Sequence, residues 1–581
     1  MPSVSLFPIG RVIGGAVLAA LVLATSGAAE IGSVTSAVVV GVAVSSNHAL
    51  PDAPVADAAQ RGDVDAVRAL LRDGADVNAA QGDGMTALHW AAHGGDAELA
   101  TVLVTAGAHP DATTRIGSYT PLHLATRAGS GAVVKIVLDA GADAMAVTTA
   151  GGATPLHFAA AAGATAPIAT LLGHGAEVDA REAMRGQTPL MFAAAYDRMD
   201  ALKLLLASGA DVAKTADAID IAARDVADRA EQRGETPPDA AQMQRYQPND
   251  EEPLSYAALV GAHGGLTALL HAAREGHQAS VMALLDAGAD INQVSTGDHT
   301  SPMLIATING HFDLALEMLE RGADAEIASD AGATPLFAAL NLHWAPKARY
   351  PQQHAYRQQQ ATYMDVMRSL LEAGVDPNVR LTRHLWYMSY NFDLLSVRVR
   401  GATPFWRAAY ALDVDAMRLL VAYGADPGMP TQKPPQRFRR DRDVNADPSG
   451  LPPVPVGGPG IYAIHAASGV GYGQGYAGNA HRHAPDGWLP AVRYLVEELG
   501  ADVNARDLNG YSALHHAAAR GDNELIEYLV EQGADVAAVS RRGQTTADMA
   551  NGPVQRIQPF PETVELLEKL GSKNNHRCVS C

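Results

Sequence analysis

At 581 residues and a formal net charge of -20, the chain is too long for one compact core, and its acidity argues against a nucleic-acid-binding surface. Hydrophobic residues make up 48% and charged residues 18%, which excludes general disorder. Aromatic residues make up only 5%, and the only two cysteines are Cys578 and Cys581. We therefore expect thin layers of small side chains, held by packing without a disulfide framework.

The N-terminal residues predict an export signal. Arg11 precedes an apolar run over 12–23, and small residues over 26–29 offer a cleavage site before Glu30. We expect an exported protein, periplasmic or extracellular, in which membrane contact is possible only through this segment. A second apolar run over 34–44 leaves an alternative, an uncleaved membrane anchor, although each run is shorter than the roughly 20 residues of a spanning helix.

An internal repeat follows this segment. Boxes of the type Thr-Pro-Leu-His begin at Thr86, Thr120, Thr154 and Thr188, each 34 residues after the one before. The phase resumes at Thr267, Thr300, Thr334, Thr403, Ser512 and Thr545. A Gly-Ala-Asp segment, as at 74–76, recurs between the boxes. A fixed period of this length predicts a repeat solenoid.

Each part of the repeat has a physical reason. The Thr hydroxyl caps a first helix, and Pro fits the first helical turn, where its missing N–H costs nothing. The imidazole can bridge backbone groups of neighbouring repeats, so the box histidines are expected to be structural: His89, His123, His157, His465 and His515. A second helix carries apolar residues at helical spacing, and Gly ends it in a left-handed conformation.

This pattern resembles the ankyrin repeat family over about Pro51 to Gly571. The resemblance implies an all-α repeat solenoid of about twelve ankyrin repeats with four loop insertions, closed by caps at Ala56 to Ala79 and Gly543 to Leu570. The expected domains are a signal peptide (1–29), a linker (30–50), repeats 1–5 (51–214), an insertion (215–264), repeats 6–8 with an internal loop (265–378), an aromatic insertion (379–400), a repeat (401–428), a Pro/Gly-rich loop (429–458), repeats with an internal Gly/Tyr loop and a C-terminal cap (459–571), and a tail with Cys-x-x-Cys (572–581).

Ankyrin arrays bind proteins through a concave face of turn tips and first helices. The resemblance places Gln81 to Met85, Arg115 to Ser118 and Arg181 to Arg185 on that face. The chain also looks like uncharacterised exported bacterial ankyrin repeat proteins with a C-terminal Cys-x-x-Cys, a group without an assigned activity.

The insertions carry the less regular features. A helix over Ile219 to Arg233 is expected in the first. The aromatic insertion concentrates rings in a chain poor in them, with Trp406 nearby in sequence, and the candidate partner-binding residues are Trp386, Tyr387, Tyr390, Phe392 and Trp406. The alternative interpretation is that these rings cover the core where the regular stack is broken.

Candidate chemistry is sparse. Cys578 and Cys581, with His576 before them, allow an inert disulfide or free tail, a redox or metal role, or an intermolecular link. His481 and His483, with His465, either gather a metal or face solvent. The basic run over 437–442 either touches an anionic lipid or acidic partner or is a solvated loop.

The sequence contains no phosphate loop, nucleophile elbow or zinc-protease motif, so we expect neither an enzyme nor a cofactor. The predicted function is an exported, monomeric scaffold that binds a protein partner through its concave face and inserted loops, without binding nucleic acid. The alternative is an envelope thiol-redox or metal-binding protein that acts through the C-terminal cysteine pair.

Overall fold

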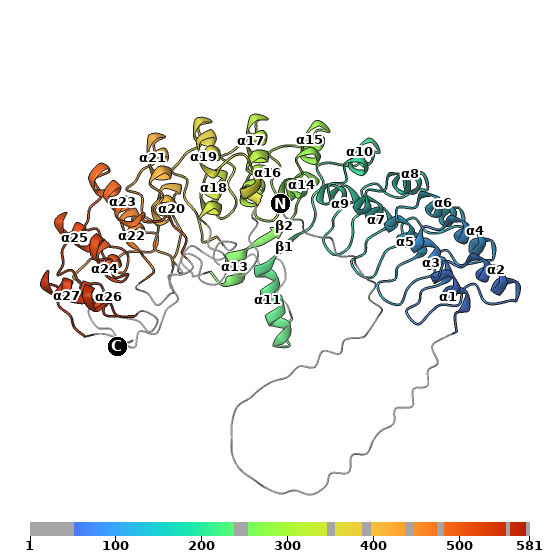
Figure 1. Ribbon diagram of the computed structural model, residues 1–581, viewed down its shortest axis with the longest axis horizontal. Helices are drawn as coiled ribbons and strands as arrows, with labels where there is room; N and C mark the ends of the chain where they lie inside the picture. The colour runs from blue at the N-terminus through green and yellow to red at the C-terminus, as the bar shows by residue number, and fades with distance from the viewer. Residues whose placement is uncertain are drawn as a thin grey trace, which may run out of the picture. The chain divides into compact units, whose positions relative to one another are not determined.

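The computed structural model describes residues 52–236, 254–344, 355–385, 397–435, 447–472, 481–552 and 558–576. They form twelve consecutive helix pairs, which lie in two rows (Figure 1). The first helices of the pairs are α1 (Pro54–Gln60), α3 (Ala87–Gly94), α5 (Pro121–Arg127), α7 (Pro155–Ala162), α9 (Pro189–Ala195), α14 (Ala268–Glu275), α16 (Pro302–Ile308), α18 (Pro335–His343), α20 (Pro404–Tyr410), α22 (Ala463–Ser468), α24 (Ala513–Ala518) and α26 (Thr546–Ala550). The second helices are α2 (Val64–Arg72), α4 (Ala97–Thr105), α6 (Gly131–Asp139), α8 (Thr165–Gly173), α10 (Met199–Ala207), α15 (Gln278–Asp286), α17 (Phe312–Glu320), α19 (Tyr363–Glu372), α21 (Val414–Ala422), α23 (Trp488–Arg493, continued by a π-helical segment Tyr494–Glu498), α25 (Asn523–Glu531) and α27 (Pro561–Lys569).

The first helices pack against one another in an unbroken series from α1 to α26. Their small side chains permit this close approach, and the paired alanines of α3, for example Ala91 and Ala92, are fully buried. The second helices cover the first and supply larger apolar residues such as Leu103 of α4. The prediction of an all-α repeat solenoid is therefore confirmed.

Side-chain caps start most first helices. Thr120 is a representative case, because its hydroxyl accepts a hydrogen bond from the backbone N–H of His123 and Pro121 follows at the first helical position. One predicted cap was wrong by a residue. Ser301, not Thr300, caps α16, since Pro302 must occupy the first helical position and the Ser301 hydroxyl accepts from the N–H of Leu304.

The last repeat closes the array with a different residue in the box. Asp548 stands where five other repeats have histidine, and no further repeat follows α26 and α27 in the described residues. The chain after α27 turns back instead, so that the backbone N–H and the side-chain amide of Asn575 both donate to the Asp548 carboxylate, at 2.9 and 3.0 Å. The carboxylate thus satisfies donors that belong to the chain's own tail.

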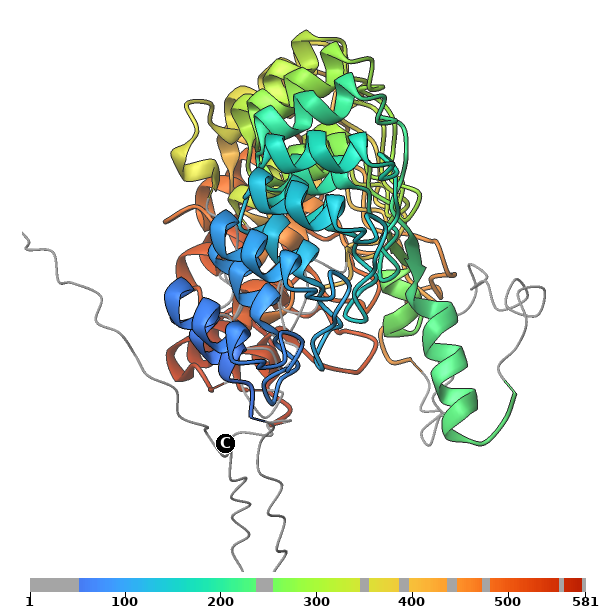
Figure 2. The ribbon, with the colours of Figure 1, turned by 90° about the vertical axis from the view of Figure 1, so that its right-hand side faces the viewer.

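The first insertion forms a small module of its own. Strand β1 (Ala218–Asp220) pairs antiparallel with β2 (Ala262–Gly264), with Ile219 opposite His263. Between the strands lie α11 (Ile221–Gln232) and α13 (Tyr256–Val260), and α11 falls where the sequence predicted a helix. Figures 1 and 2 show α11 projecting from the array beside the interrepeat loops.

None of the described helices combines the length and the apolar composition that crossing a membrane requires.

Candidate protein-binding surface

Eleven hairpins connect the twelve helix pairs. In each hairpin a backbone N–H on the first stem donates to a carbonyl on the second stem. The stem pairs, donor first, are Gln81–Met85, Thr114–Tyr119, Thr148–Ala153, Glu182–Gln187, Ala216–Leu266, Ser295–Thr300, Ser329–Ala333, Leu381–Ala402, Thr431–Ile461, Asp507–Tyr511 and Ser540–Gln544. We call these hairpins, with the insertions they carry, the hairpin edge.

Backbone hydrogen bonds also join each hairpin to the next. Arg115 N donates to Asp83 O at 2.8 Å, and Thr149 N donates to Gly117 O at 3.0 Å. The series continues without a gap through the pairs Ala183–Gly151, Asp217–Arg185, Thr296–Gly265, Asp330–Asp298, Thr382–Ala331, Gln432–Arg400, Leu508–Gly460 and Arg541–Asn509. The hairpin edge is therefore one hydrogen-bonded series from the first repeat to the last.

Three insertions enter at hairpins and leave this series intact. Their stems are Ala216 with Leu266, Leu381 with Ala402, and Thr431 with Ile461. In each case the two stems keep the ordinary hairpin bond. A carbonyl on the second-stem side of each insertion (Gly265, Arg400 or Gly460) accepts the hydrogen bond from the next hairpin. Because the extra residues extend the tips only, the insertions add surface to the hairpin edge without interrupting the helix stack.

The box histidines fasten neighbouring repeats together, as predicted. In the box that begins at Thr120, the backbone N–H of Thr120 donates to His123 Nδ1 at 3.2 Å. The ring proton is therefore on Nε2, which donates to the carbonyl of Ala153 in the next repeat at 3.2 Å. Burial disfavours the charged ring and lowers the pKa of His123 from 6.5 to about 4. His89, His157, His465 and His515 make the same bridge to the next repeat.

The structure corrects one of the candidate partner-binding residues. Trp406 is fully buried, its indole N–H donates to the Ile461 carbonyl at 2.9 Å, and its ring stacks on Tyr410 with centroids 5.4 Å apart. Leu385 and Val399, from the two stems of the aromatic insertion, join the same apolar cluster. Trp406 and these stems therefore cover the core. Trp386, Tyr387, Tyr390 and Phe392 lie outside the described residues.

The first and second tip insertions adjoin each other. The guanidinium of Arg383, on the stem of the aromatic insertion, lies 3.5 Å from the Asp330 carboxylate of the preceding hairpin. It also lies against the backbone at Gly261, where the Cβ of a larger residue would lie 3.2 Å from Arg383 Nη1. The first and second tip insertions thus form one continuous region rather than separate loops.

Two further insertions leave from the opposite end of the first helices, between α18 and α19 and between α22 and α23. Asp413, the N-cap of α21, joins the residues that flank the first of them by accepting from Trp344 Nε1 at 2.8 Å and from the Tyr363 hydroxyl at 2.7 Å. Nearby, the fully buried Arg407 donates to Asn341 Oδ1 and to the Trp344 carbonyl, and burial lowers its pKa to about 10. These contacts stabilise the packing of the ninth helix pair, α20 and α21, which we call repeat nine.

The loop histidines are part of the same packing. His481 Nε2 donates to the Tyr410 carbonyl at 2.8 Å, and burial lowers its pKa to about 3. The rings of His481 and His483 lie 5.0 Å apart, whereas His465 lies beside His516. No group of three or more potential metal ligands occurs among the described residues.

The cysteine pair and the basic run both lie beyond the part of the chain that the structure describes. This applies to Cys578, to Cys581 and to residues 437–442. His576 is described and exposed, and its backbone N–H donates to the Asn574 side chain.

Half of the exposed large apolar side chains among the described residues lie on the hairpin edge. Eight large apolar residues are exposed among those described, and four of them, Ile116, Met184, Tyr256 and Val456, lie on hairpins or their insertions. Ile116 is 83% exposed and Met184 67% exposed, each at the tip of a regular hairpin. Both fall within the stretches that the resemblance places on the binding face, although composition alone did not single them out.

Comparison with known proteins is consistent with this architecture. A family model described as ankyrin repeats (3 copies) matches residues 55–148, 140–216, 241–329 and 269–380, and a second, ankyrin repeats (many copies), matches residues 480–530. These matches cover the first eight helix pairs and the region from α23 to α25.

The chain is also similar to parts of several curated proteins. It is 35% identical to the rat ankyrin repeat and SAM domain-containing protein 6 over 103 residues, which are 16% of this chain and 11% of that protein. It is 47% identical to the human BCL-6 corepressor over 55 residues, 10% of this chain and 3% of that protein. The rat protein phosphatase 1 regulatory subunit 12A is 32% identical over 95 residues, 16% of this chain and 8% of that protein. The chain therefore spans only a small part of each of these mammalian proteins.

Among solved structures, the crystal structure of the human ASB11 ankyrin repeat domain aligns with 46% of this chain and 98% of its own length, at 25% sequence identity and a TM-score of 0.34.

Proposed function

The chain belongs to the ankyrin repeat family, and on that premise we propose that it is an exported, monomeric scaffold that holds a protein partner along the hairpin edge and the adjoining first helices. Ankyrin repeats are in general protein-interaction scaffolds, so the coarse function follows from the family. What is proposed for this chain is the face that is used, which we expect to be concave, and the compartment.

The distribution of exposed apolar side chains carries the proposal. Ile116 and Met184 stand in solvent on hairpins that backbone hydrogen bonds hold in a fixed series. Burying such a side chain in an interface is worth about 1.5 to 3 kcal/mol. Because the hairpins are already ordered, little conformational entropy is lost when a partner binds. A preformed edge with an exposed apolar side chain at two of its tips is a suitable surface for a protein partner.

The tip insertions extend this surface. The first brings Tyr256, which is exposed, and the third brings Val456. Both leave the hairpin series intact, so the added residues are free to differ from those of a regular array. We propose that they distinguish the partner of this protein from the partners of other ankyrin arrays.

Affinity capture with surface variants tests the choice of face. The double variant Ile116→Glu with Met184→Glu places charges on two tips, and Lys203→Glu places the same side chain on the exposed side of α10 as a control. We expect the wild-type chain and the control to recover the same partner, and the double variant to lose at least about tenfold of it. Equal recovery by all three chains would contradict the proposed face.

The proposal of export rests on the sequence of the first residues. Arg11, the apolar run over 12–23 and the small residues before Glu30 support a cleaved signal. Sequencing the N-terminus of the protein isolated from its source tests this. A chain that begins near Glu30 supports cleavage, and a chain that keeps residues 1–29 argues for the uncleaved anchor.

A further inference from the structure

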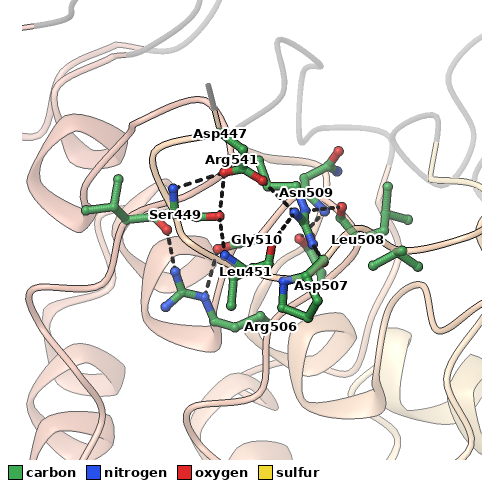
Figure 3. Close-up of polar contacts among 12 residues, drawn as sticks. Asp447, Ser449, Leu451, Arg506, Asp507, Leu508, Asn509, Gly510 and Arg541 are labelled. Carbon is green, nitrogen blue, oxygen red and sulfur yellow. Dashed lines mark hydrogen bonds and ion pairs between the residues drawn. The ribbon is translucent and has the colours of Figure 1, made fainter. Parts of the chain in front are cut away.

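The third tip insertion returns across the hairpins of the last repeats. Residues 447–459, which we call the strap, have the sequence Asp-Pro-Ser-Gly-Leu-Pro-Pro-Val-Pro-Val-Gly-Gly-Pro. Most of the strap is exposed, with Leu451 and Val454 half-buried. It lies against the hairpins whose stems are Asp507–Tyr511 and Ser540–Gln544 (Figure 3). The array therefore already carries an extended, proline-rich segment on part of its hairpin edge.

One side chain of the array, that of Arg541, makes polar contacts to three residues of the strap. Arg541 Nη1 lies 2.6 Å from Asp447 Oδ2 and donates to the Leu451 carbonyl at 3.3 Å, and Nη2 donates to the Pro452 carbonyl at 2.6 Å (Figure 3). Its Nε donates to the Leu508 carbonyl at 3.1 Å, which fixes the guanidinium on the neighbouring hairpin. All three guanidinium nitrogens of Arg541 thus make hydrogen bonds. The bond from Nε to the Leu508 carbonyl belongs to the array and orients the guanidinium towards the strap.

The strap presents its acceptors as a set. The Asp447 carboxylate accepts from the backbone N–H and the hydroxyl of Ser449, and the Ser449 hydroxyl in turn accepts from Leu451 N. This turn places one carboxylate and two successive carbonyls on the side that faces Arg541. At the other end of the strap, Lys433 Nζ donates to the Val454 carbonyl at 2.6 Å. Prolines lack a backbone N–H, so a proline-rich segment offers mainly such acceptors.

The apolar contact beneath the strap is shallow. Gly510 makes room for Leu451, since a Cβ at Gly510 would lie 3.2 Å from Leu451 Cδ1. Val456 stays exposed. The strap is therefore held by charge-assisted hydrogen bonds, one half-buried leucine and, at its end, backbone hydrogen bonds between Lys433 and the pair Gly457 and Gly458. It is not sealed by an apolar interface, so a segment with the same acceptors can take its place on Arg541.

We propose that the strap is an internal pseudoligand, and that the Arg541 surface binds an extended, proline-rich partner segment with a carboxylate ahead of its carbonyl acceptors. This inference rests on the proposed function, because it names the partner chemistry for one end of the hairpin edge. Such a partner displaces the strap and takes over its contacts with Arg541 and the Gly510 surface.

A peptide added in trans tests the proposal. The probe is a fluorescently labelled peptide with the sequence of residues 447–459, and the receptor is the full chain with residues 435–457 replaced by a short Gly-Ser linker. Circular dichroism melting first establishes that this chain keeps its helical array. We expect the peptide to bind the shortened chain at least about tenfold more tightly than the intact chain, in which the strap competes at high effective concentration.

Two variants of the shortened chain locate the contact. Arg541→Ala is expected to weaken peptide binding by at least about tenfold, because it removes the oriented fork. Arg542→Ala removes the same charge one residue further along and is expected to leave binding nearly unchanged. A peptide with Asp447→Asn is expected to bind more weakly to the shortened chain.

Hydrogen exchange in the intact chain gives an independent readout. Arg541→Ala is expected to accelerate exchange at Leu451 while the amides of α24 and α25 stay protected. Absence of peptide binding to the shortened chain, or equal binding by Arg541→Ala, would overturn the strap proposal. Recovery of a partner through Ile116 and Met184 in that case would leave the proposed function standing, so the two failures are distinguishable.

Discussion

Acid is expected to lower the stability of the array because its buried box histidines resist protonation. The size of this loss can be calculated for His123. Its pKa is about 4 in the folded chain and 6.5 when the ring is solvated, because burial disfavours the charged form. The unfolded chain therefore binds more protons below pH 6.5, and stability that is present above this pH is lost as the pH falls towards 4. Between pH 7 and pH 5 the loss from this one ring is about 2 kcal/mol. His89 and His157 have lowered pKa values from the same cause and add to the loss.

Hydrogen exchange measured by mass spectrometry tests this locally, because a repeat array need not unfold in one step. The opening free energy of amides in α5 is compared at pH 7 and pH 5, after correction for the intrinsic exchange rate. His123→Gln removes the titrating group and is expected to reduce the pH dependence by about 2 kcal/mol, although it lowers stability at pH 7 as well. His109→Gln, an exposed histidine in the same region, serves as the control. If His123→Gln and the control lose equal stability between the two pH values, the neutral buried ring is not the cause.

Three substitutions test the packing around the hairpin edge and repeat nine, each by thermal or urea unfolding followed by circular dichroism. Asp413→Asn weakens the acceptor of the Trp344 and Tyr363 donors and is expected to lower the free energy of unfolding by about 2 to 4 kcal/mol. The control Asp415→Asn, at an exposed position of the same helix, is expected to change it little. Equal losses would refute the role of Asp413 as a buried cap. Gly84→Ala and Gly74→Ala both place alanine at a positive φ, which costs about 1 kcal/mol of stability in each case. Only at Gly84 does the new Cβ lie 2.7 Å from the next hairpin, so this variant is expected to lose about 1 to 3 kcal/mol more. Equal losses would show that the two hairpins are not tightly packed at Gly84. Trp406→Ala is expected to cost about 3 to 5 kcal/mol and to leave partner affinity per folded molecule unchanged; a selective loss of binding without a loss of stability would restore the partner-binding interpretation.

The helix pairs were predictable because their signals are local. The Thr-Pro-Leu-His box places a cap, a first-turn proline and a bridging histidine within four residues, and the structure uses each as expected at Thr120, Pro121 and His123. The misplaced cap at Thr300 shows the limit of aligning on threonine alone. Proline was the stronger signal, since Pro302 dictates that Ser301 is the cap.

The candidate surface was only partly predictable, because its contacts join residues that are remote in sequence. The ion pair between Arg541 and Asp447 spans 94 positions, and no local pattern links them. Likewise, the bond between the stems Leu381 and Ala402 shows that the aromatic insertion enters at a hairpin, whereas the sequence showed only a break in the period. The burial of Trp406 depended on those stems folding over it.

The most direct test of the binding face is site-specific photo-crosslinking in the native setting. A photoreactive amino acid replaces Ile116 at an exposed hairpin tip or, in a second chain, Lys203 on the outer side of α10. The account predicts a covalent adduct with one reproducible protein from position 116 and none with that protein from position 203. Adducts with that protein from position 203 alone, or from both positions to the same extent, would contradict it.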